Sequence, residues 1–246
     1  MEWRDEALVI GVRRLGEGDV ILEVLTRDHG RHLGVVKGGR SKRLQPALQA
    51  GNSCTVVWRA RIEDQLGAFV VEPTTLRVAR LMNASAALYG LSVLVGLIRL
   101  LPERESHGAV YDTALMIADL LDDPDMAAPL LVRFELAILG ELGFGLDLGM
   151  CAATGSTQSL VYVSPKSGRA VSASAGEPWR DRLLPLPAFL RDTESPGMPS
   201  TSDILDAFTL TGYFLNRHVY EPRGLVAPDA RGAYLALIAK NPVSKA

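Results

Sequence analysis

Four cations and two glycines are packed into the stretch Lys37-Gly-Gly-Arg40-Ser-Lys42-Arg43. Lysine and arginine side chains bind phosphate oxygens, which gives a nucleic-acid affinity that depends on salt and is indifferent to sequence. Glycines would let the backbone follow a nucleic-acid strand closely, and with Pro46 they predict an exposed connection outside any core. The stretch therefore predicts a phosphate-binding loop, although an ordinary solvated loop fits the same composition.

The charge around this stretch is unevenly distributed. Residues 27–61 hold eight cations and one acid, Asp28, whereas the whole chain has a net charge of -2. Such asymmetry indicates one electropositive face on a mildly acidic body. Trp58 could stack on a base, but a tryptophan in a strand is more often core. The predicted DNA-binding residues are Arg31, Lys37, Arg40, Lys42, Arg43, Arg59 and Arg61.

Metal and enzyme chemistry are not indicated. Cys151-Ala-Ala-Thr154 has the spacing of half a zinc ribbon with its second ligand replaced, and no second cysteine pair follows. A structural zinc takes four ligands, usually Cys and His, so we expect no metal and no cofactor. The P-loop, the nucleophile elbow and the HExxH motif are missing from the sequence, so we expect no enzyme.

The first eighty residues predict β-structure. Turn signals occur at Gly16-Glu17-Gly18-Asp19 and Asp28-His29-Gly30, between short runs rich in Val, Ile and Leu. Five strands within about seventy residues fit a closed barrel, for which the OB-fold is the commonest candidate. The predicted strands are 6–14, 19–26, 31–37, 53–59 and 66–71, which places the basic stretch after the third.

The remainder of the chain predicts helices around a small insertion. Ser202-Asp203 resembles an N-cap, and Gly143 and Gly145 would end the helix before them. Residues 151–199 are rich in Ser, Gly and Pro, with short strands at 159–163 and 169–172. Residues 81–101 are long enough for a membrane span, but a buried helix is favoured because they include Asn83 and Arg99. The predicted helices are 80–101, 107–121, 127–142, 201–219 and 230–240.

Two motifs together make the chain resemble the RecO family of bacterial recombination mediators. They are the basic stretch after the third strand, and Arg133-Phe-Glu-Leu-Ala-Ile-Leu-Gly-Glu-Leu-Gly-Phe-Gly145 running towards Cys151. The resemblance implies an α+β chain with an OB-fold barrel at 1–79 and a helical domain at 80–148 and 200–246. It also implies a zinc-ribbon-like insertion at 149–199, here degenerate because Thr154, Ser172 and Ala175 stand where the family has cysteines.

The resemblance also implies a function in DNA repair and homologous recombination. Family members bind single- and double-stranded DNA, anneal complementary strands and, with RecR, help to load RecA. They also engage the C-terminal tail of single-stranded-DNA-binding protein, for which Arg133 and Phe134 are candidates by analogy. The expected location is cytoplasmic, at the nucleoid and not in a membrane. The alternative is an adaptor that recognises an acidic partner tail and has no direct DNA role.

Overall fold

The computed structural model describes residues 1–62, 64–191 and 197–240. The chain divides into two compact units, Met1–Asp122 and Asp123–Ala246. The boundary expected after residue 79 falls inside the first unit, because the helices that follow are bonded to the strands. Arg99 lies 2.8 Å from the Glu23 carboxylate, and Arg27 lies 3.0 Å from that of Asp112.

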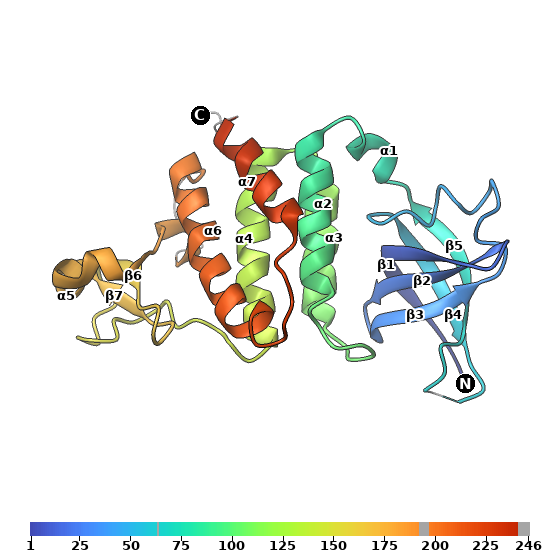
Figure 1. Ribbon diagram of the computed structural model, residues 1–246, viewed down its shortest axis with the longest axis horizontal. Helices are drawn as coiled ribbons and strands as arrows, with labels where there is room; N and C mark the ends of the chain where they lie inside the picture. Colours follow the sequence, from blue (N-terminus) through green and yellow to red (C-terminus); the bar gives the residue numbers. More distant parts are fainter. Residues whose placement is uncertain (63, 192–196, 241–246) are drawn as a thin grey trace. The chain divides into compact units, whose positions relative to one another are not determined.

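Five strands form a closed sheet in the first unit (Figure 1). They pair in the order β1-β2-β3-β5-β4, and β4 pairs back onto β1. Valine, leucine and aromatic side chains fill the interior, among them Trp58, which is 1% exposed. The predicted five strands are thus confirmed, with bounds β1 Glu2–Leu15, β2 Asp19–Thr26, β3 Gly30–Val36, β4 Ser53–Arg59 and β5 Ala68–Thr75.

Three helices complete the first unit: α1 Val78–Leu81, α2 Ser85–Ile98 and α3 Gly108–Leu120. The prediction of one helix over 80–101 is wrong, because the backbone of Ala84 is extended (φ -127°, ψ 111°) and interrupts the helical hydrogen bonds between α1 and α2. The buried helix favoured over a membrane span is confirmed by the apolar face of α2. Among the described residues, no helix combines the length and apolar character needed to cross a membrane.

A buried asparagine joins the barrel to α1. The Asn52 side-chain amide donates to the Pro46 carbonyl at 2.9 Å, and its oxygen accepts from the backbone N–H groups of Arg77 and Val78. Because Asn52 is 1% exposed, water cannot replace these bonds. The end of the β3–β4 connection that precedes β4 is therefore fixed by the side-chain hydrogen bonds of Asn52 as well as by the covalent chain.

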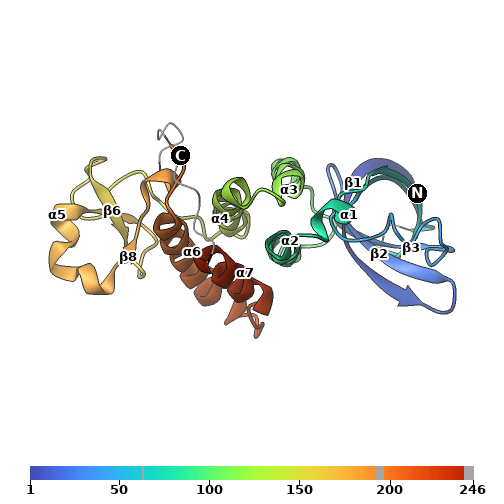
Figure 2. The ribbon, with the colours of Figure 1, turned by 90° about the horizontal axis from the view of Figure 1, so that it is seen from above.

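The second unit contains α4 Pro124–Glu141, α6 Thr201–Leu215 and α7 Asp229–Lys240, and Figure 2 shows α6 next to a small sheet. Gly143 ends α4 with a left-handed backbone (φ 84°), as predicted. The N-cap prediction at Ser202-Asp203 is wrong: Ser200 caps α6, and Asp203 completes the capping box by accepting from the Ser200 N–H. The α-helix ends at Leu215, four residues before the predicted end, and continues as the π-helical turn η3 Asn216–Tyr220.

Glu135 forms a buried ion pair in this unit. Its carboxylate has no exposed surface and lies 2.7 Å from Nε of Arg231, whose side chain is 17% exposed. The Thr211 hydroxyl donates to the same carboxylate. One buried acid of α4 is thereby satisfied from both α6 and α7, so the ion pair joins all three helices.

The predicted small subdomain contains the three-stranded sheet β7-β6-β8. Its elements are β6 Leu160–Val163, β7 Ala170–Ser172, α5 Ala173–Gly176, η1 Glu177–Arg182, β8 Leu184–Pro185 and η2 Ala188–Leu190. Beside it, Cys151 Sγ accepts from the Ser172 N–H at 3.3 Å. A hydroxyl does not replace a zinc thiolate, so this donor set does not fit zinc. No cluster of three His, Cys, Asp or Glu side chains that could hold a metal occurs in the described part of the chain.

Candidate nucleic-acid interface

Residues 37–43, hereafter the basic segment, are fastened to the turn between β1 and β2. The Gly38 N–H donates to the Asp19 carboxylate at 2.8 Å. The Arg40 backbone N–H donates to the Gly18 carbonyl at 3.1 Å, and Arg40 Nη1 donates to the Glu17 carbonyl at 2.5 Å. These bonds fix both the backbone of the segment and one of its guanidinium groups.

The expectation that residues 38–46 are wholly exposed is wrong in part. Leu44, within this range, is 8% exposed and belongs to the barrel core, as does Leu48 just beyond it, which is 2% exposed. Gly39 is also buried, and a Cβ there would lie 2.5 Å from Cγ2 of Val20. Gly39 is therefore required for close packing onto the barrel, whereas Gly38 supplies the positive φ of 63° in open space.

The four cations of the basic segment all reach solvent. Lys37, Arg40, Lys42 and Arg43 are exposed, and across the residues that the structure describes none of them pairs with a carboxylate. A cation whose charge is not already neutralised can take up a phosphate without first breaking an ion pair. These side chains are therefore suited to bind a polyanion.

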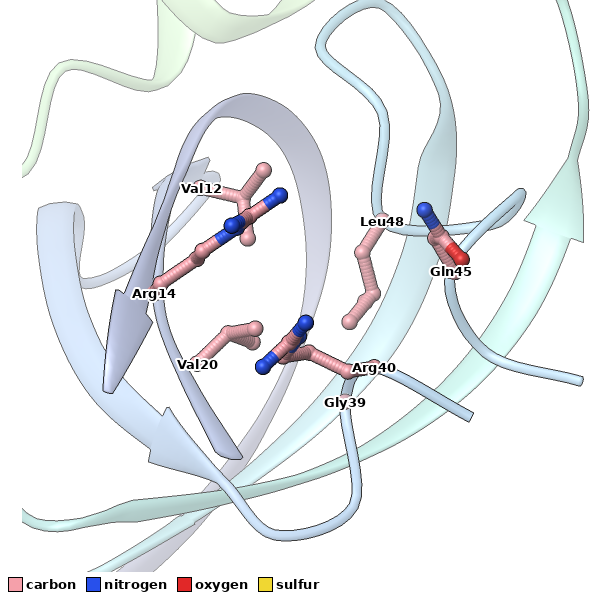
Figure 3. Close-up of a pocket in the computed structure, with 7 residues that line it drawn as sticks. All are labelled: Val12, Arg14, Val20, Gly39, Arg40, Gln45 and Leu48. Atoms are coloured by element: carbon pink, nitrogen blue, oxygen red, sulfur yellow. The ribbon is translucent and has the colours of Figure 1, made fainter. Parts of the chain in front are cut away.

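A pocket of about 260 Å³ opens next to the basic segment (Figure 3). Arg14 reaches into it from β1, and Arg40 reaches in from the other side. The side chains of Val12, Val20 and Leu48 supply an apolar floor. We call it the arginine pocket; its lining residues are Val12, Arg14, Val20, Gly39, Arg40, Gln45 and Leu48.

The strand register explains why an arginine lies in this pocket. Arg14 pairs with Val20, a residue of the barrel core, and directly paired residues point to the same side of a sheet. Arg14 thus continues the inward-facing row at the end of the β1–β2 hairpin. The sequence prediction missed Arg14 because it considered charge only from residue 27 onwards, although Arg13-Arg14 directly precedes the hairpin turn.

Among the described residues that line the arginine pocket, none is one of the other three predicted cations. Arg31 is six residues from Lys37 along β3, about 20 Å at the usual rise, and it bonds to Glu23 at 2.9 Å. Arg59 is exposed but forms an ion pair with Glu2 at 2.8 Å, and their hydrogen bond lowers the pKa of Glu2. Arg61 is exposed in the connection between β4 and β5. The basic segment and Arg14 form the candidate interface, and the DNA contacts expected of Arg31, Arg59 and Arg61 stay predictions.

The two residues expected to bind a partner tail belong to α4 in the second unit. Phe134 has no exposed surface and lies in the helical core. Arg133 is half-buried, donates to the Phe189 carbonyl, and has its guanidinium carbon 5.9 Å from the centre of the Phe189 ring. A partner could therefore reach Arg133 only beside Phe189, and could not reach Phe134 in this arrangement.

A second hollow of the first unit, about 350 Å³, is lined by aromatic rings. Trp3 stacks on His29 with ring centres 4.0 Å apart and contacts Trp58 at 5.6 Å. His32 meets both indoles edge-on and is 4% exposed, and among the described residues neither of its ring nitrogens has a hydrogen-bond partner. The indole of Trp58 is thus packed inside the barrel core, as expected for a tryptophan in a strand.

Acid is expected to destabilise the first unit through His32. Burial, followed by the charges of Arg104 and His29, lowers the pKa of His32 from 6.5 to about 4. Between these values the unfolded chain binds a proton that the native chain excludes, so the free energy of unfolding falls as the pH falls. At about 1.4 kcal/mol per pK unit, the loss reaches about 3 kcal/mol near pH 4.

Denaturant titrations at several pH values between 7 and 4 would measure this effect. The His32→Leu variant should lose most of the pH dependence, because its side chain does not titrate. An equally steep dependence in the variant would contradict the assignment to His32.

Two families of known proteins match different parts of the chain. Residues 1–75 match the family described as recombination protein O N terminal, and residues 82–225 match recombination protein O C terminal. A "DNA repair protein RecO" of Methylorubrum extorquens is 58% identical over 241 residues, covering 96% of this chain and 98% of its own length. The proteins of that name from Methylocella silvestris and Rhizobium etli are 57% and 54% identical, each covering 98% of this chain and 97% and 95% of its own length. The chain therefore belongs to the RecO family of DNA repair proteins.

Proposed function

We propose that this protein is a recombination mediator that binds and anneals single-stranded DNA through the basic segment and Arg14. With RecR and single-stranded-DNA-binding protein as partners, it would promote the loading of RecA, acting in the cytoplasm at the nucleoid. The family membership supports a role in DNA repair. The observation that carries the proposal is a set of four exposed cations that pair with no carboxylate of the described residues, on a backbone fastened beside Arg14.

The proposed mechanism of annealing is electrostatic. Two complementary strands repel each other through their phosphates, and a surface that neutralises phosphates on both lowers that repulsion. Contacts to phosphates leave the base edges free to pair with the second strand. No covalent bond is made or broken in this process, so it needs no catalytic residue.

We further propose that the closed five-stranded sheet is an OB-fold and that the small sheet next to Cys151 is a degenerate zinc ribbon. The number of strands and the closure of β4 onto β1 support the first assignment. The proximity of Cys151 to Ser172, with Thr154 close in sequence, supports the second. For the acidic tail of single-stranded-DNA-binding protein, Arg133 is the candidate contact.

The proposal predicts that charge reversal in the basic segment weakens DNA binding. The double variant Arg40→Glu/Lys42→Glu should bind a fluorescent single-stranded oligonucleotide at least ten-fold more weakly at about 0.1 M salt, with a smaller dependence on salt. Fluorescence anisotropy over a salt series measures both quantities, and annealing of complementary oligonucleotides should slow in parallel.

The matched control is Arg180→Glu/Arg182→Glu, which makes the same charge change at exposed positions of η1. It should bind DNA nearly as the wild type does. If the basic-segment variant also binds and anneals normally, the proposed DNA function is incorrect. Binding of an acidic peptide tail, with no binding of free DNA by the wild type, would favour the adaptor function instead.

A further inference from the structure

The arginine pocket has a feature that phosphate binding does not require. Its floor is aliphatic, and Val12 is 45% exposed there. A phosphate is bound by cations and N–H groups and gains nothing from an apolar surface. The volume of about 260 Å³ is also slightly below the roughly 300–1,000 Å³ of pockets for drug-sized ligands, so the pocket suits a group of ring size. Apolar floor and cationic rim together indicate a flat apolar group attached to an anion.

We propose that the arginine pocket holds one unstacked base of a DNA single strand, with the neighbouring phosphates on Arg14 and the basic segment. The pocket would then make the interface prefer unpaired over paired DNA. This inference rests on the proposed function, since it assigns a subsite within the same interface.

The side chains around the pocket match the parts of a nucleotide. A guanidinium group is planar, so Arg14 can stack on a base as well as bind phosphate. Arg40 has one N–H held by the Glu17 carbonyl, which keeps the group in place while other donors remain. The Gln45 side chain offers both a donor and an acceptor to a base edge.

The surroundings of the pocket favour DNA over an acidic peptide. Lys37, Lys42 and Arg43 continue the positive charge along the segment on which Arg40 lies. A nucleic-acid strand carries a charge at every residue and can use all of these cations, with one base turned inward. A base in a duplex would first have to leave its stack and its pair, which costs a few kcal/mol. The pocket therefore discriminates by the cost of exposing the base.

Filling the pocket without changing any charge tests the proposal. Val12 lies on a strand and is partly exposed, so Val12→Trp is compatible with the fold and places an indole in the cavity. Val70→Trp is the matched control, because Val70 is 59% exposed on β5 and does not line the pocket. The probes are a thymidine 20-mer and an abasic chain with the same number of phosphates.

The wild type and Val70→Trp should bind the thymidine oligonucleotide roughly ten-fold more tightly than the abasic chain. In Val12→Trp this ratio should fall close to one, while the affinity for the abasic chain and its salt dependence stay as in the wild type. An unchanged ratio in Val12→Trp would overturn the proposal. The proposal would also be overturned if Val12→Trp kept the wild-type ratio of the two affinities but lost binding of an acidic peptide with an aromatic end.

These outcomes are distinguishable from failure of the proposed function. If Arg40→Glu/Lys42→Glu binds both oligonucleotides like the wild type, the interface itself is misplaced. If that variant loses both but Val12→Trp keeps the wild-type ratio, the interface stands and only the base pocket is refuted.

Discussion

Replacing Lys37, Arg40, Lys42 and Arg43 together by glutamine is expected to lower the affinity for single-stranded DNA several-hundred-fold at about 0.1 M salt. Each cation that neutralises a phosphate of a single strand contributes about 0.7 to the slope of log K against log salt. Four contacts therefore account for a slope of about 2.8, or nearly three decades of affinity between roughly 0.1 M and 1 M salt. The variant and the wild type should converge at high salt.

The fold should survive this change, since all four side chains are exposed and Leu44 and Leu48 still anchor the segment. A salt series in fluorescence anisotropy gives the slope directly. The matched control replaces four exposed arginines elsewhere by glutamine and so has the same net charge; they are Arg4, Arg180, Arg182 and Arg191. Equal losses in both variants would mean that total charge, rather than the basic segment, determines binding.

Glu135→Ala is expected to destabilise the second unit by about 3 kcal/mol or more. Removing the acid leaves the Arg231 guanidinium, with 17% of its side chain exposed, without its counter-charge, and leaves the Thr211 hydroxyl without this acceptor. Breaking one half of a buried pair in this way usually costs about 3–5 kcal/mol, far more than the net stabilisation by the pair. Hydrogen exchange across α4, α6 and α7 locates the loss, and chemical denaturation measures its size.

The double variant Glu135→Leu/Arg231→Met should recover most of this stability, because two apolar side chains of similar size leave no unpaired charge. Glu72→Ala is the exposed control: Glu72 and Arg4 are 75% and 66% exposed, and such pairs contribute at most about 1 kcal/mol. A loss at Glu135 no larger than that at Glu72 would contradict the structural role assigned to the buried pair.

Local sequence signals predicted the elements and the basic segment well. Alternating apolar residues and glycine turns located the five strands, and the helical repeat located the main helices. The density of cations in residues 37–43 is visible from the sequence alone. Glycine and charge together also predict that most of that stretch lies outside a core. The same local reasoning missed Leu44, whose burial follows from the way the segment folds back onto the barrel.

What the sequence could not supply was the register between paired strands. Arg14 enters the pocket because it pairs with Val20, and that pairing follows a shift in register between Val9 and Gly11 of β1. Moving a strand by one residue would turn Arg14 to the other side of the sheet. Likewise, Arg31 looks like its neighbours in a count of charges, but its partner Glu23 lies on the adjacent strand β2.

The anchoring of the basic segment also bears on the rate at which DNA arrives. A loop that is disordered before binding must be ordered during it, which slows productive encounters and costs conformational entropy. Here the contacts of Leu44 and the bond from Arg40 to Glu17 hold the backbone of the segment and one of its guanidinium groups in place beforehand. Collisions guided by long-range attraction can then lead directly to a bound state, so the association rate constant should be high and should fall steeply with ionic strength.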